Sequence, residues 1–157
     1  MRSGWLIKKI IRTYRLHSSE RDADYRLNRL QSIIVLESAV QAQSNKLGFH
    51  AKSVVIRNQK RRWGSCSNRG TISLNYRVAL LPPCLRDYVI IHELCHLKEM
   101  NHGPRFWALV ALHCPWYRER IVALRAMEKH FHVPGEEFEN LGQQECCGHC
   151  GGVRVLV

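Results

Sequence analysis

Hydrophobic positions divide the 157-residue chain into helical and extended segments. Between Leu27 and Val40, apolar residues recur at the three- and four-residue spacing of a helix face, and Gly48 ends the pattern. We therefore expect a long helix over about 22–46. After Gly48, short β-branched runs at 54–56 and 71–74 are typical of strands. The Asn-Arg-Gly sequence at 68–70 predicts a turn between the second and third members of a small antiparallel sheet.

Prolines and glycines punctuate the rest of the chain. Pro82-Pro83 ends the sheet, and an apolar-periodic helix is expected from Leu85 to Met100. Two more helices are expected, one opening at Pro104 and one near 116–130. The fold class is therefore α+β: a compact domain with a long N-terminal helix, a small antiparallel sheet, a central helix and C-terminal helices. Three parts are expected: a basic N-terminal segment (1–21), this domain (22–130), and an acidic, then Cys-rich, loosely ordered tail (131–157).

Composition narrows the class of protein. The apolar fraction of 45% and charged fraction of 24% are typical of a globular chain and exclude wholly disordered or collagen-like classes. No apolar run approaches the ~20 residues that a spanning helix needs, so transmembrane and secretory classes are disfavoured. The chain has seven cysteines, an odd number, and they are not evenly spaced as in a disulfide framework. This suggests a reducing compartment, and we expect a cytoplasmic protein.

The net charge of +11 is unevenly distributed. Residues 38–86 hold nine Lys and Arg side chains and no Asp or Glu, which indicates a surface for nucleic acid, nucleotide phosphates or anionic lipid. Lys60, Arg61 and Arg62 are the candidate phosphate-binding residues. A solvated face that only keeps the protein soluble explains the charge equally well.

The expected central helix contains the pattern H-E-x-x-H. His92 and His96 lie one turn apart on the same face, so both imidazoles can bind one zinc ion while Glu93 reaches a zinc-bound water. A catalytic zinc site usually has a third protein ligand, and His102 follows just beyond the expected helix end. Chance alone gives about 0.002 occurrences of this combination in a chain of this composition. The alternative is that His92 and His96 are ordinary core or surface histidines on an amphipathic helix and that Glu93 is solvated.

Four stretches together resemble the YgjP-like metallopeptidase family, which is related to the SprT-like and WLM zinc proteases: IRNQKRRWGSCS (56–67), ISLNYR (72–77), YVIIHELCHL (88–97) and NHGPRFW (101–107). The resemblance covers about residues 26–125. It implies a zincin-like domain, one zinc ion per chain held by His92, His96 and His102, and Glu93 as the catalytic acid/base. Ahead of the long helix, the family usually has strand-forming sequence where this chain has a basic helix-like segment.

These observations predict a zinc-dependent metallopeptidase that hydrolyses a peptide or protein substrate with a zinc-activated water and Glu93 as general base, and that acts near nucleic acid. Trp63, Gly64 and Arg105 are the candidate substrate-binding residues. Core and bulge roles for Trp63 and Gly64 are at least as well supported. Arg105, His113 and Tyr117 are the candidate oxyanion donors.

Two other functions are weighed against the peptidase. A metal-dependent nucleoside triphosphate pyrophosphohydrolase would bind the phosphates of its substrate with the basic residues of 38–86, the basic block. A non-catalytic, zinc-containing nucleic-acid-binding module would have no need of Glu93. The tail offers a candidate second, structural zinc site formed by Cys146, Cys147, His149 and Cys150, with a loosely ordered tail as its alternative. Cys66, Cys84, Cys95 and Cys114 are expected to act as small buried hydrophobes.

Overall fold

The structure is a computed structural model that describes residues 18–59 and 62–132. Along the chain, its elements are α2 (Ser18–Leu47), β1 (Ser53–Arg57), β2 (Gly64–Cys66), β3 (Thr71–Asn75), the 3-10 helix η1 (Tyr76–Leu80), α3 (Pro83–Cys95), α4 (Pro104–His113) and α5 (Tyr117–His132). The α+β class is confirmed, and no described helix is long and apolar enough to cross a membrane.

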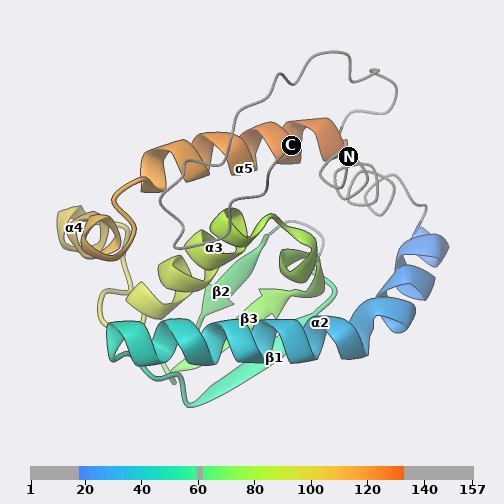
Figure 1. Cartoon of the computed structure of the whole chain (residues 1–157), viewed down its shortest axis with the longest axis horizontal. Helices are drawn as coiled ribbons and strands as arrows, with labels where there is room; N and C mark the ends of the chain where they lie inside the picture. The colour runs from blue at the N-terminus through green and yellow to red at the C-terminus, as the bar shows by residue number, and fades with distance from the viewer. Residues whose placement is uncertain (1–17, 60–61, 133–157) are drawn as a thin grey trace, which may run out of the picture.

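Helix α2 runs across the molecule beside the sheet (Figure 1) and packs against β1, η1 and α3. Its buried positions recur about every four residues, which is the spacing of a single helix face. They are Ser32, Leu36, Val40, Ser44 and Leu47. The helix ends at Gly48, whose φ of 72° is a left-handed conformation and whose N–H donates to the Ser44 carbonyl at 2.8 Å.

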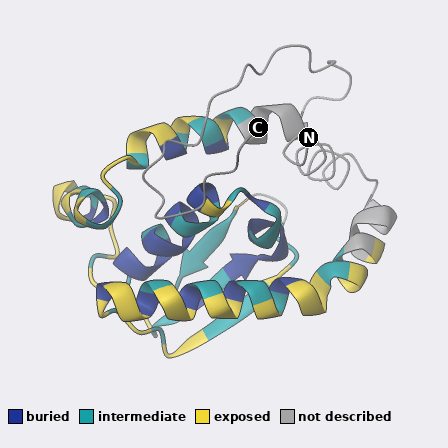
Figure 2. Cartoon of the chain, viewed as in Figure 1, coloured by how far each residue is buried: buried dark blue, intermediate teal, exposed yellow. Residues whose placement is uncertain are grey.

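The opposite face of α2 is exposed although it carries apolar residues, which the apolar spacing predicted would face the core. Leu27, Leu30 and Ile34 are exposed, whereas two serines, Ser32 and Ser44, lie in the buried face. Figure 2 shows this division as an exposed outer side and a buried inner side of the same helix. Apolar spacing alone therefore predicted the helix but not which of its residues would be buried.

The three strands form one mixed sheet in the order β1-β3-β2. β2 and β3 pair antiparallel through the turn at 67–70, where Gly70 has a φ of 80°. β1 pairs with β3 in parallel, with Val54 opposite Ile72 and Ile56 opposite Leu74. The prediction of an all-antiparallel sheet was therefore wrong for β1, because β1 and β2 lie on opposite sides of β3 and do not form a hairpin with each other.

Helix α3 is the central element and contacts α2, β2, α4 and α5 (Figure 1). Nine of its residues are buried, including Ile90 and Leu94, so nearly every side of the helix faces protein. It ends at Cys95, five residues earlier than expected, and tight turns at Leu97 and Lys98 then reverse the chain. This early end leaves His96 at the helix terminus and brings the following segment back toward α3.

Candidate metal centre

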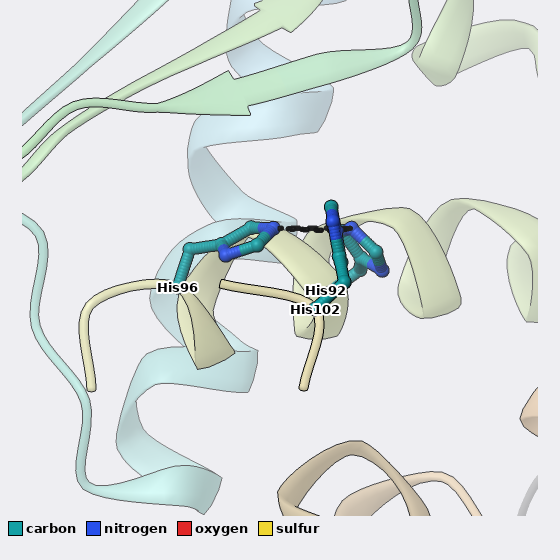
Figure 3. A group of neighbouring side chains, drawn as sticks. All are labelled: His92, His96 and His102. Carbon is teal, nitrogen blue, oxygen red and sulfur yellow. Dashed lines mark hydrogen bonds between the residues drawn. The ribbon is translucent and has the colours of Figure 1, made fainter. Parts of the chain in front are cut away.

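Three imidazole rings meet at the end of α3. His92 lies in the last turn of the helix, His96 caps it, and His102 immediately precedes Gly103, the N-cap of α4. The Nε2 atoms are 3.3 Å apart between His92 and His96, 3.0 Å between His96 and His102, and 3.1 Å between His102 and His92. Figure 3 shows the rings directed at one common point. These three are the only group of metal-binding side chains found within the described residues.

The other ring nitrogens have partners that set the orientation of two rings. His96 Nδ1 lies 3.1 Å from the Glu99 carbonyl oxygen, to which it can only donate. His92 Nδ1 lies 3.5 Å from the Tyr88 hydroxyl. With the proton on Nδ1, as the Glu99 carbonyl requires for His96, the Nε2 atom keeps a lone pair that can bind a metal ion.

The donor set fits a zinc ion. Imidazole nitrogens bind zinc at ~2.0–2.1 Å in a tetrahedral arrangement, which places neighbouring nitrogens about 3.3 Å apart. The observed separations of 3.0–3.3 Å are close to that value. Three histidine ligands with a fourth position open are typical of a catalytic zinc site rather than a closed structural one.

Aromatic rings support the three histidines. Phe106, which is fully buried, lies under all of them, with ring-centroid distances of 4.9 Å to His92, 4.4 Å to His96 and 4.7 Å to His102. The Trp107 ring stacks on His102 at 5.7 Å. Because His102 is exposed and lies on a loop, these contacts from α4 are what hold its ring in place.

Burial also disfavours the charged form of two of these histidines, His92 and His96. It lowers the pKa of His92 to about 3, and the nearby His96 and His102 add to the effect because they would repel its positive charge. Burial likewise lowers the pKa of His96. A histidine binds a metal only in its neutral form, so protons do not compete for these two side chains at neutral pH.

Glu93 points away from solvent toward the sheet. It is 5% exposed, and its carboxyl end lies against the backbone of Gly64, the first residue of β2. Burial raises its pKa to about 8, and the positive charge of Arg62 acts in the opposite direction. Among the described residues, Glu93 Oε2 is buried and has no hydrogen-bond partner.

The comparisons with known proteins agree with this geometry. The YgjP-like metallopeptidase domain family matches residues 2–127, which is most of the chain. The chain belongs to the YgjP-like metallopeptidase family. No curated protein matches it significantly.

Two solved metallopeptidase zymogens are similar to this YgjP-like chain. Abylysin of Pyrococcus abyssi is 32% identical, with a TM-score of 0.51, over 60% of this chain and 93% of its own. Jannalysin of Methanocaldococcus jannaschii is 24% identical, with a TM-score of 0.47, over 57% of this chain and 96% of its own. Membership in a metallopeptidase family favours the peptidase over the phosphohydrolase and the binding module.

The structure separates the other candidate residues of this YgjP-like domain. Gly64 lies beside Glu93, whereas Trp63 is half-buried and packs against the hydrophobic core. Arg105 is exposed at the start of α4. His113 packs edge-on against Phe49, 5.4 Å between ring centroids. Tyr117 is linked to the histidines, because its ring stacks at 5.4 Å on Trp107, which itself stacks on His102.

The basic block is not one continuous surface. Arg77 is buried and donates to the Gln59 carbonyl at 3.3 Å, and Arg86 lies 3.8 Å from Asp87. Arg62 is exposed. Lys60 and Arg61 lie outside the described residues, as does the candidate second site at Cys146, Cys147, His149 and Cys150.

The described cysteines form no disulfide. Cys84 and Cys95 are buried, as expected for small hydrophobes, and Cys66 and Cys114 are half-buried.

Sequence reasoning missed two features of the site. Tyr88 lies one turn before His92 and contacts its Nδ1 atom, a partnership for which the i, i+4 spacing was the available signal. Phe106 and Trp107 belong to the NHGPRFW stretch and fall in the helix expected after Pro104, but the sequence assigned them no role in the site. Their contact with the histidines depends on how α4 packs against α3, which no local pattern in the sequence specifies.

Proposed function

We propose that this chain is a zinc-dependent peptidase that hydrolyses peptide bonds in a peptide or protein substrate. His92, His96 and His102 hold one zinc ion, and Glu93 is the general base. The observation that carries the proposal is the convergence of three Nε2 atoms within 3.0–3.3 Å at the end of the helix that also carries a buried carboxyl group.

The chemistry divides between the metal and Glu93. When bound, zinc polarises a carbonyl group and lowers the pKa of a water molecule. Glu93 accepts the proton of the attacking water and returns it to the departing amine. Glu93 must be ionised to accept that proton. Burial raises its pKa above the ordinary carboxyl value, which strengthens it as a base, and the positive charge of Arg62 acts in the opposite direction.

Tyr117 is our candidate for the residue that donates a hydrogen bond to the developing oxyanion. Of the three residues considered, it is the one whose ring connects through Trp107 to His102. Its hydroxyl accepts a hydrogen bond from Arg118 Nε at 3.2 Å and keeps its own proton to donate.

The direct test is Glu93→Gln, which preserves the size of the side chain and removes its capacity to take a proton. We expect the variant to bind zinc as the parent protein does and to cleave a library of quenched fluorescent peptides roughly 10²- to 10⁴-fold more slowly. Elemental analysis and the cleavage rate are the two measurements.

The matched control is Glu37→Gln, the same substitution on the exposed face of α2. It should leave both zinc content and cleavage unchanged. Undiminished cleavage by Glu93→Gln would contradict the proposed role of Glu93.

A further inference from the structure

Gly64 begins β2, the edge strand that faces α3. Its backbone position is fixed from the sheet side, because Gly64 is paired with Leu74 of β3 and the neighbouring Trp63 carbonyl accepts the Asn75 N–H at 2.8 Å. β2 in turn packs directly against α3 (Figure 1). The strand therefore presents to α3 a backbone that is held in place by its pairing with β3.

The carboxyl end of Glu93 occupies the space that a side chain at position 64 would need. A Cβ atom built on Gly64 would lie 2.6 Å from Glu93 Oε1, 2.8 Å from Cγ and 2.9 Å from Cδ. All three distances are well below van der Waals contact. The overlap includes Cγ, near the root of the side chain, so rotating only the carboxylate would not relieve it.

Glycine is needed at position 64 because there is no room for a side chain, and not because of the backbone conformation. Gly48 and Gly70 have φ values of 72° and 80°, which favour glycine on conformational grounds. Gly64 is not among the positive-φ glycines, so other residues could adopt its backbone angles. Any larger residue at position 64 would displace the Glu93 side chain.

From these contacts we infer that Gly64 is a positioning residue for the general base: its bare backbone fixes where the Glu93 carboxyl group lies relative to the three histidines. The inference rests on the proposed function of Glu93. The sequence made Gly64 a candidate substrate-binding residue, whereas the group that lies against its backbone here is Glu93.

The first test is Gly64→Ala, measured for zinc content, kcat and KM on a quenched fluorescent peptide that the parent protein cleaves. The histidines are untouched, so zinc content should stay at the parent level. We expect kcat to fall roughly 10- to 100-fold, because a displacement of about 1 Å in a reacting group has effects of that size. KM should change little, since the substrate is still bound.

The matched control is Gly103→Ala, the same substitution beside His102. A Cβ atom there would have no heavy atom within 4 Å, and φ is −80°. Its zinc content and kcat should match those of the parent. A parent-like kcat in Gly64→Ala would overturn the inference.

A second test measures the contact itself and needs no activity. Gly64→Ala should lower the melting temperature by several degrees when Glu93 is present, because the new methyl group overlaps its side chain. In a Glu93→Ala background the same substitution should cost much less, because the space is then free. This coupling would also appear as rescue of folding if Gly64→Ala alone does not fold.

Each outcome separates this inference from the proposed function. An equal loss of stability in both backgrounds, or no rescue, would show that Gly64 serves the strand alone and would overturn the inference. Strong coupling together with full cleavage by Glu93→Gln would keep the contact and reject Glu93 as the base.

Discussion

Glu93 is the buried carboxyl group on which both the proposed chemistry and the stability of the site depend. Its pKa of about 8 in the folded chain lies above the ordinary value of 4.5. The folded state therefore keeps a proton that the unfolded state releases. The stabilisation from this group is complete below pH 4.5 and is lost as the pH rises through about 8.

His92 behaves in the opposite sense. Its pKa of about 3 lies below the ordinary 6.5, so its contribution to stability is present above pH 6.5 and is lost as the pH falls toward 3. The two effects oppose each other between pH 4.5 and 6.5. Between pH 6.5 and 8, Glu93 is the one of the two that still changes its contribution.

We therefore predict that the free energy of unfolding of chelator-treated protein falls by about 2 kcal/mol between pH 6.5 and 8, since one proton contributes up to about 1.4 kcal/mol per pH unit. Glu93→Gln should remove most of this slope. Urea unfolding at a series of pH values measures it. Identical slopes in the parent and the variant would assign the pH dependence to other groups.

At the scale of secondary structure, Asn75 connects the sheet to the segment that leads into β2. Its side-chain nitrogen donates to the carbonyls of Gln59 at 2.7 Å and Arg62 at 3.2 Å, and its oxygen accepts the Arg77 N–H at 3.2 Å. One side chain thus caps η1 and holds the chain just before Gly64. The placement of β2 beside Glu93 depends on it.

Removing this amide should loosen that connection. We predict that Asn75→Ala destabilises the fold by about 1–3 kcal/mol, because it removes three hydrogen bonds that are buried or partly buried. Asn45 makes an exposed side-chain contact with Gln41 on α2 and provides the control, with an expected cost within about 0.5 kcal/mol for Asn45→Ala. Denaturant unfolding compares the two, and equal costs would show that the Asn75 hydrogen bonds contribute nothing beyond those of a surface amide.

The local elements could be predicted from the sequence where one periodicity decides them. The i, i+4 spacing of His92 and His96 placed both on one helix face, and Gly48 ended α2 as expected. The parallel pairing of β1 with β3 could not be predicted, because it depends on which side of β3 each of the other strands occupies. The buried serines of α2 and the contact between Gly64 and Glu93 likewise depend on neighbours distant in sequence.

At the scale of the whole molecule, the elements assemble the site from one helix, one loop and one strand. α3 supplies His92 and Glu93, the early helix end lets His102 return, and β2 closes against Glu93. Family membership over residues 2–127 and the metal-binding geometry support the same class of activity. Binding of nucleic acid by the basic block, a cytoplasmic location and a second zinc site in the tail stay predictions.

The most direct test of the central claim is the zinc content of the purified protein, measured by elemental analysis beside a His92→Ala/His96→Ala double variant. We predict about one zinc per chain in the parent that is lost in the variant, because three converging imidazoles form the site and two would be gone. A second equivalent that survives in the variant would belong to the cysteine-rich tail. The account would be contradicted if the parent protein, prepared without chelators, contained no zinc. It would also be contradicted if the parent and the variant had the same zinc content.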